Sequence, residues 1–76
     1  MMKKNVLLSS VDVSTRRKRR GAVSLAIDLL EKIRFAEQKY LDRIPLNFHG
    51  STAYVAAEDT VYNLIMTIVI LSDAFE

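Results

Sequence analysis

The fold is decided by residues 51–75, which read STAYVAAEDTVYNLIMTIVILSDAF. Apolar side chains recur in this stretch at alternating steps of three and four residues, the spacing that keeps side chains on one side of an α-helix. Ser51 stands just before the pattern and is a favourable N-cap residue. We therefore predict a helix over residues 52–75. The predicted inner side of this helix consists of Tyr54, Ala57, Val61, Leu64, Ile68, Leu71 and Phe75.

The same predicted helix carries apolar residues on a second side. At about 100° per residue, these residues lie roughly opposite the inner side. A helix that is apolar on two sides must be covered twice. We expect a second helix of the chain to cover one side, and a second copy or another protein to cover the other. The candidate oligomer or partner interface is Val55, Tyr62, Ile65, Met66 and Val69.

A second helical pattern precedes this one, and we predict a helix over residues 14–43. Ser14 or Thr15 is a suitable N-cap residue. Pro45 ends the helix, because the residue before a proline is disfavoured in helical geometry. Residues 44–51 are the predicted loop. The predicted inner side of this first helix is Ala22, Ala26, Leu29, Ile33, Ala36 and Tyr40, widened by Leu25, Leu30 and Leu41, and Ile27 and Phe35 fall outside it.

These elements predict an all-α fold, an antiparallel two-helix hairpin preceded by an arm over residues 1–13. A single domain of 76 residues buries only about 60% of its unfolded surface, so a monomer is marginally stable. The chain has no cysteine and therefore no disulfide to stabilise a small core. We expect two hairpins to dimerise into a four-helix bundle.

Charge is unevenly distributed along the chain. Residues 1–20 hold seven cations and one acidic residue, whereas residues 21–76 hold four cations and eight acidic residues. Five of the cations are consecutive, and cations in a first helical turn oppose the helix dipole. Such a run indicates an anionic partner, either nucleic acid or an acidic protein surface. The alternative is a solvated helix start that faces acidic residues of a neighbouring copy. The run is Arg16, Arg17, Lys18, Arg19 and Arg20.

The sequence contains no pattern typical of an enzyme, a metal site or a cofactor site. Thiolate ligands and a cysteine nucleophile are excluded, and one histidine, His49, makes a poor metal site. No serine has an acid–base partner at a suitable spacing. We expect His49 to fill a loop position. We expect Glu37 to accept hydrogen bonds from the backbone amides of residues 51–53 or to pair with Arg43.

Membrane insertion is not expected from the apolar segment. Its longest part, residues 61–71, extends over about 16 Å as a helix, against about 30 Å of hydrocarbon. The N-terminal apolar run is too short for a signal peptide. We therefore expect a cytoplasmic protein without membrane contact.

The loop and its flanks resemble a family of small helical-hairpin proteins from bacterial phages and mobile elements. The resemblance covers about 45 residues and depends on Glu31-Lys32-Ile33, Glu37-Gln38-Lys39-Tyr40-Leu41-Asp42, Ile44-Pro45, Asn47, Gly50-Ser51 and Ala56-Ala57-Glu58-Asp59. No biochemical activity comes with this family. The chain departs from it where the second helix has apolar residues in place of acidic ones, which favours a covered outer side.

Two functions follow as hypotheses. The first is a non-enzymatic protein-interaction module of phage or mobile-element origin, with inhibition of a host system as one form of it. The second is a nucleic-acid-binding accessory protein that uses residues 16–20. Steep loss of binding with added salt would distinguish phosphate contact from binding to a protein partner.

Overall fold

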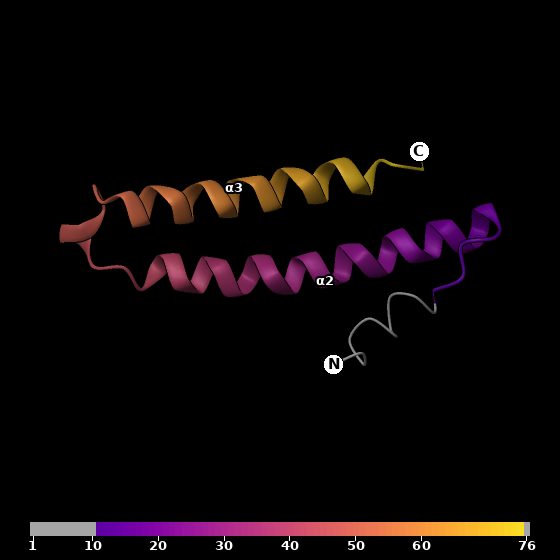
Figure 1. The fold of residues 1–76 in the computed structure, drawn as a ribbon, viewed down its shortest axis with the longest axis horizontal. Coiled ribbons are helices and arrows are strands. Elements are labelled where there is room, and N and C mark those ends of the chain that lie inside the picture. Colours follow the sequence, from indigo (N-terminus) through magenta and orange to yellow (C-terminus); the bar gives the residue numbers. More distant parts are fainter. Residues whose placement is uncertain (1–10, 76) are drawn as a thin grey trace.

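The computed structural model describes residues 11–75, which form an antiparallel helical hairpin (Figure 1). Helix α2 spans Arg16–Asp42 and helix α3 spans Thr52–Ser72. A short 3₁₀ helix, η1, spans Leu46–Phe48 in the connection. The predicted all-α hairpin is confirmed. The predicted arm lies outside the described residues up to residue 10, and residues 11–13 form neither helix nor strand.

Each helix begins at a hydroxyl cap. The Thr15 Oγ1 atom accepts a hydrogen bond of 3.1 Å from the Lys18 amide, and Ser51 Oγ accepts one of 3.1 Å from the Tyr54 amide. Both caps satisfy a backbone N–H group that has no partner inside its helix. Ser51 is therefore the cap that the sequence predicts.

The connection is closed by His49. Its Nε2 atom lies 3.0 Å from the Ile44 carbonyl oxygen, and its ring stacks on the Tyr54 ring with centroids 4.1 Å apart. The His49 amide also donates to the Leu46 carbonyl within η1. His49 thus joins the end of α2 to the first turn of α3, a more specific role than the predicted filling of a loop position.

The inner side of α3 is the one that the sequence predicts. Ala57, Val61 and Ile68 are 5%, 6% and 8% exposed, and they are the buried residues of the described chain. The other four predicted inner residues are half-buried. Their alternating spacing places all seven along the side of α3 that packs on α2.

The inner side of α2 is one residue out of step with the predicted one. Leu29 is 53% exposed and Tyr40 is 50% exposed, so most of the predicted inner side faces outward, and the prediction is wrong at these positions. Ala22 and the two predicted flanking leucines Leu30 and Leu41 are half-buried. Apart from Ala22 and Gln38, the half-buried residues of α2 follow a parallel series, one position further along the chain, which Ile44 continues. This series is Val23, Ile27, Leu30, Arg34, Glu37, Leu41 and Ile44.

Side-chain size and the loop explain the difference. Half of the predicted positions are alanine, whereas Val23, Ile27 and Leu30 remove more apolar area from water when they face α3. Ile44 directly precedes Pro45 and continues the observed series beyond the end of α2. The chain therefore enters the loop with this side of α2 already turned toward α3.

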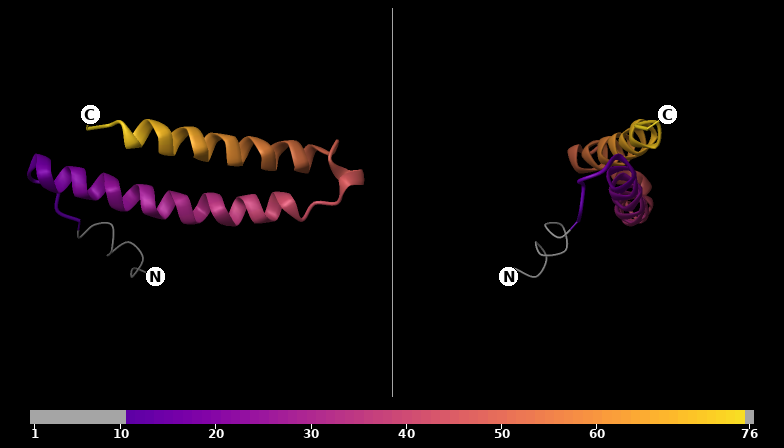
Figure 2. Two further views of the ribbon diagram at one scale, coloured as in Figure 1. Left: turned by 180° about the vertical axis from the view of Figure 1, so that it is seen from behind. Right: turned by 90° about the vertical axis from the view of Figure 1, so that its right-hand side faces the viewer.

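The hairpin is a single layer of two helices. The end-on view in Figure 2 shows α3 over α2, with no further described segment covering either helix. Among residues 11–75, each helix therefore packs along one side on the other helix, and the segment before α2 contacts only the first turns of α2.

Candidate interaction surfaces

Helix geometry divides the open surface of the hairpin into two opposite sides. A residue that precedes an inner position lies about 100° to one side of it, and a residue that follows lies about 100° to the other side. Because α2 and α3 are antiparallel, the preceding residues of both helices share one side of the hairpin. The following residues share the opposite side.

The first side is formed by the residues that precede the inner positions, and within α2 and α3 none of these residues is charged; Arg43, which precedes Ile44, lies just past the end of α2. We call it the uncharged face. In α2 it contains the whole of the predicted but unused inner series. Its residues are Ala22, Ala26, Leu29, Ile33, Ala36 and Tyr40 from α2, and Ala53, Ala56, Thr60, Asn63, Thr67 and Ile70 from α3.

Two threonines on the uncharged face form hydrogen bonds within their own helix. Thr60 Oγ1 donates to the Ala56 carbonyl at 3.0 Å, and Thr67 Oγ1 donates to the Asn63 carbonyl at 2.7 Å. This back-bonding satisfies the hydroxyl hydrogens without an external partner. The face therefore presents mainly aliphatic groups.

The opposite side combines apolar and charged residues. Five exposed apolar residues of α3 lie on this side of the hairpin and on the side of α3 that faces away from α2. Tyr62 is the most exposed of them, at 62%. We call this set the α3 patch; it is the interface that the sequence predicts, Val55, Tyr62, Ile65, Met66 and Val69. All five are exposed in the hairpin, as an uncovered second side requires.

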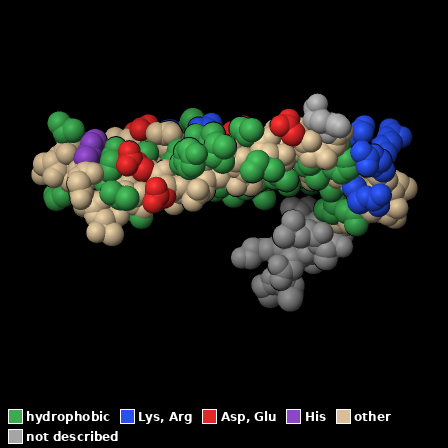
Figure 3. All heavy atoms as spheres, turned by 90° about the horizontal axis from the view of Figure 1, so that it is seen from above, with side chains coloured by type: hydrophobic (Ala, Val, Ile, Leu, Met, Phe, Trp, Pro, Cys, Tyr) green, Lys and Arg blue, Asp and Glu red, His purple; other side chains and the backbone are tan. Residues whose placement is uncertain are grey.

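Figure 3, which looks onto α3, shows how charge is arranged around these apolar residues. Apolar side chains occupy the middle of the molecule, most of the visible acidic side chains lie toward the loop end, and one lies toward the other end. Lysine and arginine side chains gather at the opposite end. The five-cation run of the sequence thus forms a basic end of the hairpin, although Lys39 and Arg43 lie toward the loop end and Asp73 lies at the end of α3.

The basic end contacts the last residues of α3. The Arg16 guanidinium carbon lies 5.0 Å from the centre of the Phe75 ring, and that of Arg20 lies 5.7 Å from it. Both distances fall within the range of cation–π attraction. Two cations of the run therefore pack on Phe75, a residue of the predicted inner side of α3.

Two further cations of the run bind the segment before α2. Lys18 Nζ lies 2.7 Å from Asp12 Oδ2, and Arg19 donates to the Val13 carbonyl at 3.0 Å. The Lys18 ammonium, together with the Ser14 amide, holds the pKa of the Asp12 carboxyl below its ordinary value. Arg17 has no hydrogen-bond, ion-pair or aromatic partner among residues 11–75.

The antiparallel fold also reduces the electrostatic cost of the run. Its cations oppose the dipole of α2 at the N-terminus, but the negative end of the α3 dipole lies beside them. The contacts of Arg16 and Arg20 with Phe75, three residues after α3 ends, show this proximity. Tertiary structure therefore supplies a compensation that the isolated first helix lacks.

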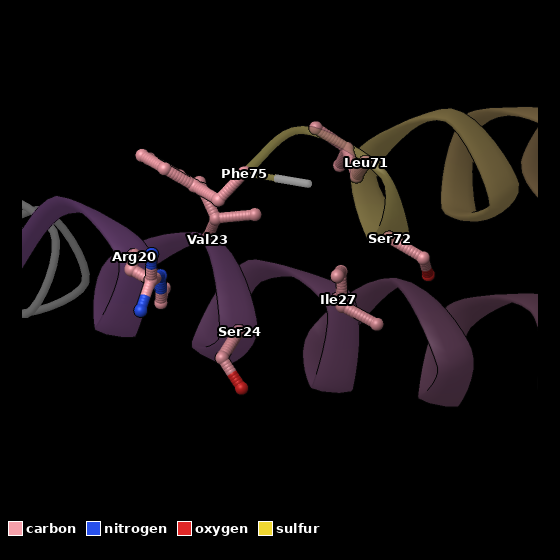
Figure 4. Close-up of a pocket in the computed structure, with 7 residues that line it drawn as sticks. All are labelled: Arg20, Val23, Ser24, Ile27, Leu71, Ser72 and Phe75. Atoms are coloured by element: carbon pink, nitrogen blue, oxygen red, sulfur yellow. The ribbon is translucent and has the colours of Figure 1, made fainter.

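A groove of about 550 Å³ lies between the two helices at this end (Figure 4). Its lining is mostly apolar, with one guanidinium and two serine hydroxyls. Ser24 and Ser72 both follow inner positions, so the groove opens on the side opposite to the uncharged face. The lining residues are Arg20, Val23, Ser24, Ile27, Leu71, Ser72 and Phe75.

Glu37 does not make the contacts that the sequence suggests. It is half-buried on the inner side of α2, but no hydrogen bond joins it to the amides of residues 51–53, and no ion pair joins it to Arg43. Ser51 Oγ accepts from the Tyr54 amide instead. Within residues 11–75, no three His, Cys, Asp or Glu side chains are close enough to hold a metal ion.

Helix α3 is long and apolar enough to cross a membrane by length and composition, the one such helix in the described part of the chain. Its 21 residues extend over about 32 Å, comparable with about 30 Å of hydrocarbon. The length argument drawn from residues 61–71 is therefore wrong. A cytoplasmic location and the absence of membrane contact stay predictions.

The comparisons with known proteins leave the family open. No protein-family model matches the chain, and neither a curated protein nor a solved structure is significantly similar to it. The functional case therefore depends on the surfaces described above.

Proposed function

We propose that the chain is a non-enzymatic protein-interaction module. In this proposal two hairpins pair into a four-helix bundle, and each presents the α3 patch to a partner protein. The observation that carries it is the exposure of the large apolar side chains on α3, while the described chain buries only three residues. Contiguous exposed apolar residues rimmed by charge are typical of protein-interaction sites.

The composition of the α3 patch supports a protein partner. Aromatic residues and methionine are enriched in protein interfaces, and the patch contains Tyr62 and Met66. Tyr62 offers a large apolar ring with a hydroxyl at its tip, which is typical of residues that dominate binding energy. Binding alone, without a catalytic residue, metal or cofactor, is the activity we propose.

The resemblance of the loop to phage and mobile-element hairpins bears on the identity of the partner. If the chain shares that origin, the partner is a host or phage protein, and inhibition of a host system is the corresponding outcome. The loop residues that carry the resemblance are also structural, because Pro45 is the N-cap residue of η1 and Ser51 caps α3.

Affinity capture with matched variants tests this proposal. The tagged parent chain should recover a specific host protein, and the variant Tyr62→Ser/Met66→Ser should lose it. The control is Leu46→Ser, which removes an exposed apolar side chain from η1, outside the patch. A partner that is retained by the patch variant, or lost equally from the control, would contradict the assignment of the α3 patch.

The second candidate is a nucleic-acid-binding accessory protein, favoured by the gathering of residues 16–20 at one end of the hairpin (Figure 3). Four of these five cations have partners within the chain, which leaves Arg17 as the one without a described partner. A mobility-shift titration over a salt series tests this candidate, because phosphate contacts give an affinity that falls steeply with salt. Arg17→Gln should then weaken binding and flatten the salt dependence.

A further inference from the structure

We propose that a second copy of the chain covers the uncharged face in antiparallel orientation, with α2 packed on α2 of the partner. This inference assigns the interface of the proposed four-helix bundle. It rests on one part of the proposed function, the association of two hairpins. The α3 patch lies outside this interface and remains open to a different partner.

The uncharged face is suited to burial in a dry interface. Its α2 and α3 residues carry no charge to desolvate, with Arg43 at its edge beyond the end of α2, and Thr60 and Thr67 have donated their hydroxyl hydrogens within α3. Burial of a polar group without a partner is costly, and this face largely avoids that cost. Leu29, Ile33 and Tyr40 supply large exposed apolar side chains on its α2 half.

The spacing of the α2 residues on this face is self-complementary. These residues are spaced symmetrically about residue 31. The symmetric pairs are Ala22 with Tyr40, Ala26 with Ala36, and Leu29 with Ile33. A twofold axis at that level places Tyr40 opposite Ala22 of the partner subunit. It also brings Leu29 opposite the partner's Ile33. The largest side chain thus meets a small one at each end of the contact, and branched aliphatic groups meet at the centre, as an isologous interface requires.

Charge favours the antiparallel orientation over a parallel one. The same axis places residues 16–20 level with residues 42–46 of the partner, at its loop end, where Asp42 and Arg43 offset one another. The loop end as a whole is net negative, because residues 37–59 hold four acidic residues and two basic ones. Asp42 and Glu58 both lie near Tyr54 at that end, where burial and their negative charges raise the pKa of the Tyr54 hydroxyl. The basic end of one copy therefore lies near acidic residues of the other. A parallel dimer would bring two runs of five cations together, and like charges in an interface disfavour association.

Cysteine crosslinking tests the orientation in a chain that has no native cysteine. Ala26 and Ala36 lie about 15 Å apart along one helix, too far for a disulfide within one chain. In the proposed pair, Ala26 lies opposite the partner's Ala36, whereas identical positions of the two copies are also about 15 Å apart and too distant for a disulfide. The double variant Ala26→Cys/Ala36→Cys should form a covalent dimer on mild oxidation, while each single variant should not. Lys32→Cys/Lys39→Cys, on the side of α2 turned away from both α3 and the uncharged face, is the control for random collision.

Each other crosslinking result overturns the proposal. Covalent dimers of both single variants would show a parallel α2 pair. A double variant that crosslinks no more than the Lys32→Cys/Lys39→Cys control would show that α2 does not pack on α2 of a second copy. Both crosslinking results can be interpreted even if the chain forms dimers through another surface.

Light scattering on surface variants separates this inference from the proposed partner site. The parent should have twice the mass of the chain, and Ile33→Glu should raise the dissociation constant of the dimer more than about tenfold because it buries an unpaired charge. Ile33 is exposed in the isolated hairpin, so the variant should keep its helix content by circular dichroism. Ile65→Glu, in the α3 patch, should remain dimeric and lose the captured partner.

The opposite pattern would overturn the interface. A dimer that persists in Ile33→Glu and dissociates in Ile65→Glu would place the copies on the α3 patch. A parent that remains monomeric in solution would also overturn the interface, because no second copy would then cover the uncharged face. Partner capture through Tyr62 and Met66 could still succeed in either case, so the two proposals fail separately.

Discussion

The Arg16 guanidinium lies over the Phe75 ring, with 5.0 Å between the guanidinium carbon and the ring centre. These residues are separated by almost the whole described chain, and they meet because the hairpin returns α3 to the start of α2. Arg20 reaches the same ring at 5.7 Å. Part of the basic run therefore belongs to the structure of the hairpin, and only the remainder is free for a partner.

A double-mutant cycle should detect this contact. We expect Arg16→Gln and Phe75→Leu to show a coupling in the free energy of unfolding of about 0.5–1 kcal/mol, typical of an exposed cation–π pair. Arg17→Gln is the matched control and should show no coupling with Phe75→Leu. Urea denaturation of the four chains measures both quantities. Equal coupling for Arg16 and Arg17 would indicate a general effect of net charge instead of a contact with the ring.

Burial in α3 should determine which isoleucine stabilises the hairpin. Ile68 is 8% exposed and Ile70 is 66% exposed. We expect Ile68→Ala to lower the free energy of unfolding by about 2–5 kcal/mol, the usual cost of emptying a core position. The same change at Ile70 should cost within about 0.5 kcal/mol, as for an exposed position. Thermal melting followed by circular dichroism compares the two, and similar losses would mean that Ile70 is also covered in solution.

The cap of α3 should be energetically significant. Ser51→Ala removes the hydroxyl that accepts the Tyr54 amide hydrogen, and we expect it to lower stability by about 1 kcal/mol. Ser51→Asp is the rescue variant, because aspartate also caps helices and its charge favours a helix N-terminus. If the alanine variant melts at the temperature of the parent, α3 begins at a different residue.

The Tyr54 hydroxyl should make stability fall at alkaline pH. Burial, reinforced by the negative charge of Glu58, raises the pKa of Tyr54 above its ordinary value. The folded state then holds the phenol proton more tightly than the unfolded state, so its contribution is complete below the unfolded pKa of about 10. This contribution to stability is lost as the pH rises from the pKa of Tyr54 in the unfolded state through its pKa in the folded state. Denaturation midpoints across this range should decline less in Tyr54→Phe than in the parent.

Local features of the chain were readable from the sequence because they depend on neighbouring residues. The proline that ends the first helix, the Ser51 cap and the inner side of α3 each follow from short-range geometry and spacing. The second apolar side of α3 was predicted in the same way, since the helical period fixes which residues share a side. The basic run was equally visible, although its contact with Phe75 was not.

Only the tertiary structure decided which side of α2 faces α3. Two series in α2, one beginning at Ala22 and the other at Val23, have the same helical spacing, and periodicity cannot choose between them. The choice depends on how the chain enters the loop at Ile44 and on how much apolar area each series buries against α3. Residues far apart in the chain decide this together, and the result leaves an uncharged face outward that the sequence alone assigned to the interior of the hairpin.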